Sequence, residues 1–163
     1  MEGREAFEFK DERTGQYLAI RNDRDHATQR IFFGGDHDET LTGGPDRDRL
    51  YGGLGDDRLI GNGQNDYLEG NAGIDRLEGG EGNDELHGGE GNDSNIHGAG
   101  LYGGAGEDAL YGEAGHDFLD GGDDRDLLVG GYGQDHLMGG DAIESRIMSA
   151  TALIPSSSVR INT

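Results

Sequence analysis

The sequence contains no cysteine and no tryptophan, and basic and apolar residues are both scarce. The absence of cysteine excludes disulfide bonds and thiolate metal sites. Only 31% of the 163 residues are apolar, so a conventional globular core is not expected. No apolar run is long enough to span a membrane, and the first residues do not resemble a cleavable signal peptide.

Acidic residues dominate the charge. Asp and Glu number 34 against 13 Lys and Arg, which gives a net charge of −21 and argues against a nucleic-acid partner. Residues 34–140 hold 25 of the acids, five of the bases and 31 of the 33 glycines. A chain of this composition is either disordered or requires cations to fold.

The glycine-rich centre is a tandem repeat of nine residues. Fixed periodicity of this kind predicts a solenoid, in which each unit buries its apolar side only by stacking on its neighbours. Ten units align: GGDHDETLT (34–42), GGPDRDRLY (43–51), GGLGDDRLI (52–60), GNGQNDYLE (61–69), GNAGIDRLE (70–78), GGEGNDELH (79–87), GGAGEDALY (103–111), GEAGHDFLD (112–120), GGDDRDLLV (121–129) and GGYGQDHLM (130–138).

Each position of the repeat has a physical role. Gly or Asn at positions 1, 2 and often 4 predicts a turn, because these residues tolerate left-handed backbone. Position 6 is Asp in every aligned unit except the first, which has Glu39. Positions 7 to 9 predict a strand about three residues long, with position 8 pointing inward. Position 8 is always leucine: Leu41, Leu50, Leu59, Leu68, Leu77, Leu86, Leu110, Leu119, Leu128 and Leu137.

The recurring acids favour a metal rather than catalysis. Carboxylates and free turn carbonyls form an all-oxygen ligand set, which suits Ca²⁺. The six histidines do not recur at one repeat position, so a zinc array is not expected. An array of equivalent acids also lacks the asymmetric pair that general acid–base catalysis needs, and no catalytic motif is present. We therefore expect no enzyme activity in this chain.

Residues 34 to about 140 resemble the RTX family, the hemolysin-type calcium-binding nonapeptide repeats with the consensus GGxGxDxLx. GGLGDDRLI (52–60) and GGEGNDELH (79–87) match it at every defined position. The resemblance implies an all-β fold, a parallel β-roll: a right-handed solenoid of two short parallel sheets in which two nonapeptides make one coil. It further implies roughly six to eight calcium ions between turns stacked on the same edge. One turn would supply the carbonyls of positions 2 and 4 and its Asp, and the next turn the carbonyls of positions 1 and 3 and its Asp.

Carried over to this sequence, the resemblance implies six ligand sets. They are Gly53, Gly55, Asp57 with Gly70, Ala72, Asp75; Gly44, Asp46, Asp48 with Gly61, Gly63, Asp66; Asn62, Gln64, Asp66 with Gly79, Glu81, Asp84; Asn71, Gly73, Asp75 with Gly88, Glu90, Asp93; Gly104, Gly106, Asp108 with Gly121, Asp123, Asp126; and Glu113, Gly115, Asp117 with Gly130, Tyr132, Asp135. The side chains at positions 3 and 5 are expected to be unimportant, because the ligands there come from the backbone.

Three departures from the pattern affect the expected sites. His37 and Glu39 replace consensus residues, which weakens the pairing of the first turn with Gly52, Leu54 and Asp57. Gly122, Asp124 and Asp126 have only Gly139 and Asp141 of a partial unit as partners. The stretch from Gly88 to Gly103 is too short to hold two complete units. We interpret 94–102 as an acid-free replacement of one unit, with Leu101 inward, so that one edge loses an ion. On the other edge, Gly89, Gly91 and Asp93 would face Gly103, Ala105 and Asp108.

Three regions follow from these patterns. Residues 1–33 are expected to form a β cap, with strand-like patches at 6–9, 17–20 and 31–33, and Phe32 at position 8 would cover the first leucine. Residues 34–140 form the β-roll, with an irregular unit at 94–102. Residues 141–163 form a tail, in which Ile143, Ile147 and Met148 have helical spacing and predict a short capping helix that ends before Pro155.

The resemblance also implies a biological role. Such repeats fold on calcium outside the cell and support secretion and folding of a larger exported bacterial protein, which leaves through a type I secretion machinery that reads an uncleaved C-terminal signal. We accordingly expect a fragment of a secreted, extracellular protein that is an enzyme or a toxin. The alternative is an interaction module whose outer face binds a polysaccharide or a cell surface. No nucleic acid and no transmembrane segment are expected.

Overall fold

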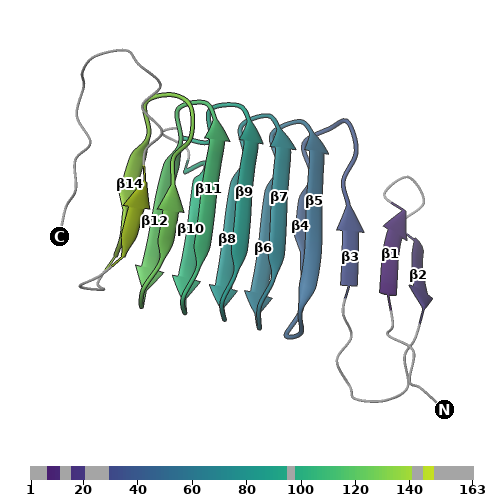
Figure 1. Cartoon of the computed structure of the whole chain (residues 1–163). Coiled ribbons are helices and arrows are strands. Elements are labelled where there is room, and N and C mark those ends of the chain that lie inside the picture. Colours follow the sequence, from purple (N-terminus) through teal and green to yellow (C-terminus); the bar gives the residue numbers. More distant parts are fainter. Residues whose placement is uncertain (1–6, 12–15, 21–29, 95–97, 141–144, 149–163) are drawn as a thin grey trace.

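The computed structural model describes residues 7–11, 16–20, 30–94, 98–140 and 145–148, which form a β-solenoid of about six coils (Figure 1). None of these residues belongs to a helix, and therefore none to a membrane-spanning helix. The strands are β1 (Phe7–Asp11), β2 (Gln16–Ile20), β3 (Arg30–Phe33), β4 (Thr40–Thr42), β5 (Asp48–Leu54), β6 (Arg58–Gly63), β7 (Tyr67–Ala72), β8 (Arg76–Glu81), β9 (Glu85–Glu90), β10 (Gly100–Ala105), β11 (Ala109–Ala114), β12 (Phe118–Asp123), β13 (Leu127–Val129), β14 (His136–Met138) and β15 (Arg146–Met148).

From β3 onward, successive strands alternate between two sheets that lie face to face (Figure 1). Sheet A has the order β15-β13-β11-β9-β7-β5-β3-β1-β2, and sheet B has the order β14-β12-β10-β8-β6-β4. Among the described strands, every pairing is parallel except that of β1 with β2. Two nonapeptides therefore make one coil, which confirms the expected parallel β-roll.

The space between the sheets is filled by one residue per unit. The position-8 leucines are at most 5% exposed, and they line up across strands, as Leu50 does with Leu68. Phe32 extends this column at the N-terminal end, where it is buried beside Leu50, as predicted. Because strand side chains alternate in direction, positions 7 and 9 point outward on both sheets.

Most strands are longer than the three residues predicted: eight contain six or seven residues, whereas β4, β13, β14 and β15 contain three. Pairing continues into the turn: Gly53 pairs with Asn71, and Leu54 pairs with Ala72. The residue at position 2 takes a left-handed backbone in many turns, with φ of 117° at Gly53 and 76° at Asn71. The chain thereby bends while its peptide groups still form hydrogen bonds with the neighbouring coil.

The irregular segment does not replace a unit, so the prediction for 94–102 is wrong. Leu101 lies in β10 and pairs with Leu77 on one side and Leu119 on the other, as any position-8 leucine would. Leu101 follows Asp93 by eight residues, whereas Leu77 follows Asp75 by two. Residues 94–99 are therefore six extra residues within a single unit, 88–102, and the coil that contains them is longer than its neighbours by the same amount.

Arg76 anchors the described part of this insertion. Its Nη1 donates to the carbonyl oxygen of Gly98 at 2.6 Å, and its guanidinium lies 4.7 Å from the centroid of the Tyr102 ring. Arg76 also forms an ion pair with Glu78, which is shared with the outward-facing Arg58 of the neighbouring strand β6.

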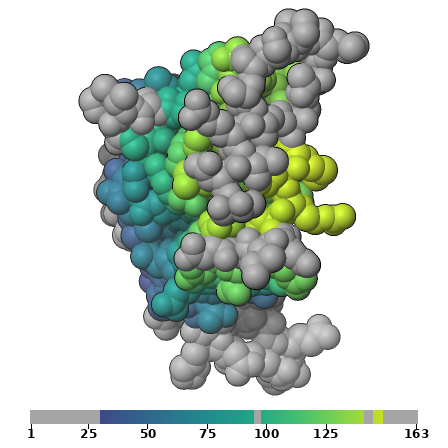
Figure 2. Space-filling view, turned by 90° about the vertical axis from the view of Figure 1, so that its left-hand side faces the viewer, coloured from purple at the N-terminus to yellow at the C-terminus, as the bar shows by residue number. Residues whose placement is uncertain are grey.

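Both ends of sheet A extend beyond sheet B. At the N-terminal end, β1 pairs with β3 and β2 completes a hairpin, which accounts for the expected β cap. At the C-terminal end, β15 pairs with β13 and is the yellow part of the chain in Figure 2. Ile147 of this strand packs against the core. The short helix that was predicted to end before Pro155 is therefore wrong for 145–148, because Ile147 pairs with Leu128 as another inward residue; residues 141–144 and 149–163 lie outside the described part.

Candidate metal-binding edges

The turns of the solenoid form two columns. Edge 1 holds the turns that lead from sheet A to sheet B, and edge 2 holds those that lead from sheet B to sheet A. The edge 1 turns begin at Gly34, Gly52, Gly70, Gly88, Gly112 and Gly130, and the edge 2 turns begin at Gly43, Gly61, Gly79, Gly103 and Gly121.

The position-6 aspartates form a continuous hydrogen-bonded ladder along each edge. The backbone N–H of Asp57 donates to Oδ1 of Asp75 at 2.8 Å, and the N–H of Asp75 donates to Oδ1 of Asp93 at 2.8 Å. On edge 2, the N–H of Asp48 donates in the same way to Asp66, at 2.7 Å. One oxygen of each carboxylate thus fixes the side chain against the preceding coil, which leaves the second oxygen for another partner.

That second oxygen is buried and has no hydrogen-bond partner among the described residues. This holds for Oδ2 of nine aspartates: Asp57, Asp66, Asp75, Asp84, Asp93, Asp108, Asp117, Asp126 and Asp135. A buried charged acceptor without a donor is costly, so native proteins pair such groups or use them to coordinate metals. The repetition of one orphaned oxygen in nine turns indicates a common ligand with positive charge.

Backbone carbonyl oxygens converge on the same place. A methyl group added to Gly61 would contact Asp66 Oδ2 and would lie 2.6 Å from the carbonyl oxygen of Gly79 in the next turn. Gly70 has the same arrangement, with Asp75 Oδ2 and the carbonyl oxygen of Gly88 at 2.7 Å. Glycine at position 1 therefore leaves room in which two acceptors approach each other without a donor. A hard cation with oxygen ligands fits this donor set.

The electrostatics agree with the geometry. Burial is the main cause that raises the pKa of Asp66 to about 8, and the neighbouring carboxylates Asp84 and Asp48 raise it further. Burial likewise raises the pKa of Asp75 and of Asp93 to about 7. These groups resist ionisation unless a cation compensates their charge.

Side-chain ligands alone do not make a site here. Among the described residues, no cluster of three or more His, Cys, Asp or Glu side chains could hold a metal. Any site must therefore take most of its oxygens from the backbone. Calcium accepts this readily, because it takes six to eight oxygen ligands in flexible geometry, whereas zinc prefers histidine and cysteine.

In each of the six predicted turn pairs, the two turns are 18 residues apart and stack on the same edge. It contradicts the predicted pairing across the irregular segment. Asp93 lies on edge 1 and Asp108 on edge 2, so Gly89, Gly91 and Asp93 do not face Gly103, Ala105 and Asp108.

Two further pairs bridge the insertion instead. The N–H of Asp84 donates to Asp108 Oδ1 at 2.8 Å, and the N–H of Asp93 donates to Asp117 Oδ1 at 3.1 Å, each over 24 residues. Neither edge loses a turn, so the predicted gap is wrong. The residues that the sequence analysis missed are Gly80, Gly82, Gly112 and Ala114, whose turns stack across the insertion.

The N-terminal end of each column differs from the middle. The first edge 1 turn stacks on the second, where Leu54 N–H donates to the Gly35 carbonyl oxygen at 2.8 Å. Glu39, however, turns its Oε2 back to the N–H of Gly35 at 2.9 Å, within its own turn. On edge 2, Asp48 accepts from the backbone N–H of Arg30 at 2.7 Å and of Gly44 at 2.5 Å. The Arg30 charge also favours ionisation of Asp48, although burial still raises the pKa of Asp48 overall.

The C-terminal end of edge 2 also differs from its middle. Gly140 stacks closely on Gly122, as the partial repeat predicts. The group that accepts from the Asp126 N–H is not a carboxylate but the hydroxyl of Ser145, at 3.4 Å, and this hydroxyl in turn donates to the Gly139 carbonyl oxygen at 3.0 Å. Asp141, the acid expected in this partial unit, lies outside the described residues.

Position 5 carries a second ladder that the sequence analysis did not predict. Asp56 N–H donates to Asp38 Oδ1 at 3.0 Å, and Ile74 N–H donates to Asp56 Oδ1 at 2.8 Å. Asn92 and His116 form similar bonds to the following turn. A short polar side chain at position 5 therefore supports the next coil, and the expectation that this side chain is unimportant is wrong.

Comparison with known families agrees with this geometry. The model of the RTX calcium-binding nonapeptide repeat matches four segments, residues 33–68, 60–94, 101–128 and 114–142, which together cover more than half of the chain. The matches stop at residue 94 and resume at 101, where the six extra residues lie. No curated protein and no solved structure matches the chain. The chain therefore belongs to the RTX family of calcium-binding repeat proteins, and its repeats form a structural calcium-binding β-roll rather than a catalytic fold.

Proposed function

We propose that this chain is a folding module of a larger secreted bacterial protein and that calcium drives its folding outside the cell. The row of buried, unpartnered aspartate Oδ2 atoms carries this proposal. A chain with net charge −21 gains little by folding until these carboxylates are compensated. Binding free energy then becomes folding free energy, as in other metal-dependent small folds.

Eight calcium ions fit the stacked turns, four on each edge. On edge 1 they lie between the turns that begin at Gly52, Gly70, Gly88, Gly112 and Gly130, and on edge 2 between those that begin at Gly43, Gly61, Gly79, Gly103 and Gly121. Each ion takes two position-6 carboxylates and the carbonyls of positions 2 and 4 of one turn and of positions 1 and 3 of the next. This extends the six ligand sets inferred from the sequence to the two turn pairs across the insertion.

Calcium-dependent folding would give secretion a direction, from the cytosol to the outside of the cell. In a calcium-poor cytosol the acidic repeats stay unfolded, which suits passage through a type I secretion machinery. Outside the cell, calcium folds residues 34–140, while residues 1–33 and 141–163 act as caps or links to the rest of an exported enzyme or toxin.

Circular dichroism during a calcium titration tests this function. The calcium-free protein should lack β structure and gain it cooperatively near millimolar calcium. Equal β signal in excess EDTA would contradict the proposal. Magnesium at the same concentration is the matched control and should fold the chain poorly, because a carbonyl-rich site demands dehydration that Mg²⁺ resists.

A second candidate function is interaction with an acceptor such as a polysaccharide or a cell surface. One observation favours it: a groove with exposed apolar side chains crosses the outer face of sheet A beside edge 1. Its lining shares several residues with the proposed calcium sites, but these residues would bind calcium through their backbone carbonyls, which leaves their side chains free to face the groove.

A further inference from the structure

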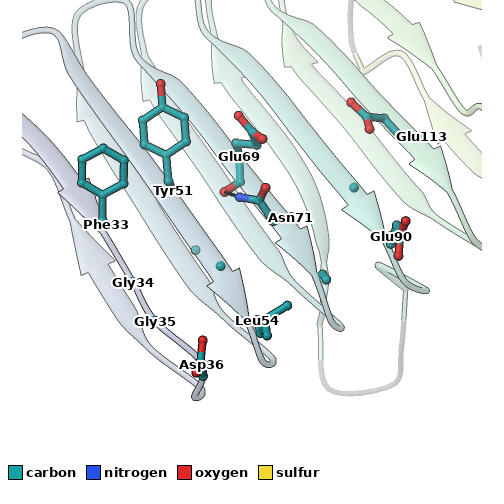
Figure 3. Close-up of a pocket in the computed structure, with 14 residues that line it drawn as sticks. Phe33, Gly34, Gly35, Asp36, Tyr51, Leu54, Glu69, Asn71, Glu90 and Glu113 are labelled. Atoms are coloured by element: carbon teal, nitrogen blue, oxygen red, sulfur yellow. Dashed lines mark hydrogen bonds between the residues drawn. The ribbon is translucent and has the colours of Figure 1, made fainter.

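The groove on sheet A lies beside edge 1 and has a volume of about 670 Å³ (Figure 3). It crosses the strands rather than running along them, because its lining comes from five coils, β3 to β11. Position-9 side chains, including Phe33, Tyr51 and Glu69, form one row, and position-3 side chains, including Leu54 and Glu90, form the other. The floor between the rows includes glycine backbone of positions 1 and 2.

Part of this groove is apolar and open to solvent. The side chain of Leu54 is 55% exposed, and Phe33 is 46% exposed and stacks on Tyr51 at a centroid distance of 5.1 Å. Such exposure is notable in a chain with few apolar residues, and clustered exposed apolar side chains usually mark a contact surface. The rings and Leu54 offer dispersion contacts to a ligand lying across the strands.

The rest of the lining is acidic. Four carboxylates face the groove, Asp36, Glu69, Glu90 and Glu113, and the described lining contains no Lys, Arg or His. Glu69 is fixed by the Tyr67 hydroxyl at 2.9 Å, and Glu113 by the His87 ring at 2.9 Å. Charge complementarity therefore selects a ligand with several positive groups and some apolar surface.

The spacing selects among such ligands. Neighbouring strands of a sheet lie about 4.8 Å apart, so the groove offers similar contacts once per coil at that interval. Successive rings of a β-1,4-linked pyranose chain follow one another at nearly the same interval, with alternate rings turned over, so that their amino groups alternate between the two rows of the groove. Alternate side chains of an extended peptide repeat at about 6.6–6.8 Å and would drift out of register with the coils.

We propose that this groove binds an oligosaccharide of β-1,4-linked amino sugars with free ammonium groups. The ammonium groups pair with Glu69 and Glu90, and the sugar rings lie against Phe33, Tyr51 and Leu54. This inference rests on the second candidate function, acceptor binding, and requires the roll to be folded.

Isothermal titration of the calcium-loaded chain with a β-1,4-linked glucosamine hexamer tests the inference, at a mildly acidic pH where the amines are protonated. The N-acetylated hexamer is the neutral comparison and should bind more weakly. Glu90→Gln should weaken binding of the glucosamine hexamer about two- to fivefold, the size of one exposed ion pair. Tyr51→Ala should also weaken it.

Glu81→Gln is the matched control. Glu81 also occupies position 3 and is also exposed, but it lies on edge 2, away from the groove. In the proposed calcium sites Glu81 and Glu90 each contribute only a backbone carbonyl, so neither substitution removes a calcium ligand. Equal weakening by Glu81→Gln would mean nonspecific attraction of a polycation and would overturn the site. A hexalysine peptide that binds as tightly, and loses affinity in Glu90→Gln, would assign the groove to basic peptides instead. Circular dichroism of each sample separates the outcomes: no binding by a calcium-folded chain overturns this inference alone, whereas no folding in calcium overturns the proposed folding function.

Discussion

Oδ1 of Asp75 accepts the backbone N–H of Asp57, 18 residues earlier in the chain, at 2.8 Å. The bond positions the carboxylate of one coil against the backbone of the coil before it. Asp75 thereby lies between two neighbouring turns of edge 1, and its remaining oxygen is buried without a partner among the described residues. Each interior aspartate can thus contribute to two proposed calcium sites, one on either side of its turn.

Asp75→Asn and Asp117→Asn should therefore weaken calcium-dependent folding to similar extents. Asp75 lies between Asp57 and Asp93, and Asp117 lies between Asp93 and Asp135. Asparagine keeps the shape of the side chain but removes its charge. We expect a several-fold rise in the calcium midpoint, measured by circular dichroism, and the loss of up to two bound ions in equilibrium dialysis.

Asp135→Asn is the comparison for these variants. Asp135 lies in the last complete turn of edge 1 and takes part in one proposed site only. Its substitution should raise the midpoint less and remove a single ion. If Asp117→Asn behaved like Asp135→Asn, the pairing of Asp93 with Asp117 across the insertion would be wrong.

Deletion of residues 94–99 should leave the number of bound calcium ions unchanged. The deletion converts 88–102 into GGEGNDGLY, a regular unit, and both aspartate ladders already bypass the insertion. The contact of Arg76 with Gly98 is lost, but the position-8 column remains. Equilibrium dialysis and the calcium midpoint check this expectation.

Removal of residues 58–63 is the control for that deletion. It also takes out six residues, but these belong to β6 and the start of a regular turn, so it should disrupt folding at every calcium concentration. A lost ion in the 94–99 deletion would show that the insertion itself contributes ligands.

Arg30→Met should raise the calcium midpoint without changing the number of ions. The Arg30 charge favours ionisation of buried Asp48 at the start of edge 2, where no earlier turn lies among the described residues. Its loss should cost on the order of 1 kcal/mol. Arg49→Met removes the same charge from the outer face of β5 and should have a smaller effect; an equal shift would point to net charge alone.

In the absence of calcium, acid should partly replace the metal. The folded-state pKa values of Asp66, at about 8, and of Asp75, at about 7, lie above the ordinary value of 3.8 because of burial. The folded form therefore binds more protons than the unfolded form. Protonation stabilises it fully below the unfolded pKa, and this contribution is lost as the pH rises through about 6 to 8.

Circular dichroism of the chelator-treated, dialysed chain at acidic and alkaline pH checks this linkage. More β structure should be present at the acidic pH, with sedimentation to show that the sample remains dispersed close to the sequence pI of about 4.3. Equal or greater β content at alkaline pH would mean that the buried aspartates are not the main obstacle to folding without metal.

The period of the sequence predicts a solenoid, and the regular recurrence of leucine at position 8 predicts its inward column. The arrangement as a two-sheet roll with two edges was implied by the resemblance to RTX repeats and not by the spacing alone. The insertion was misplaced because 94–102, which is nine residues long, was interpreted as a unit of its own that follows the turn 88–93. The sequence Gly100-Leu101-Tyr102 directly before Gly103 already has the form of positions 7 to 9, and this signal identifies 94–99 as extra.

Other features depend on contacts that spacing does not reveal. Ile147 lies at helical spacing from Ile143, yet tertiary pairing with Leu128 makes it part of a strand. Ser145 takes the place of an aspartate only because the partial turn after Gly139 is one residue longer than a regular one. The second ladder at position 5 uses Asp, Asn and His as hydrogen-bond acceptors. Because the residue type varies, the sequence pattern does not reveal that these side chains have the same role.

The Asp57–Asp75 bond has a consequence for the length of the molecule. Each coil presents the same N–H to the coil that follows and the same carboxylate to the coil that precedes it. A coil of two nonapeptides is therefore interchangeable with its neighbours, and whole coils can be gained or lost by duplication or deletion of the coding sequence without any new junction having to evolve. The number of coils acts as an adjustable spacer, by which a lineage can set the distance between whatever lies before and after the roll.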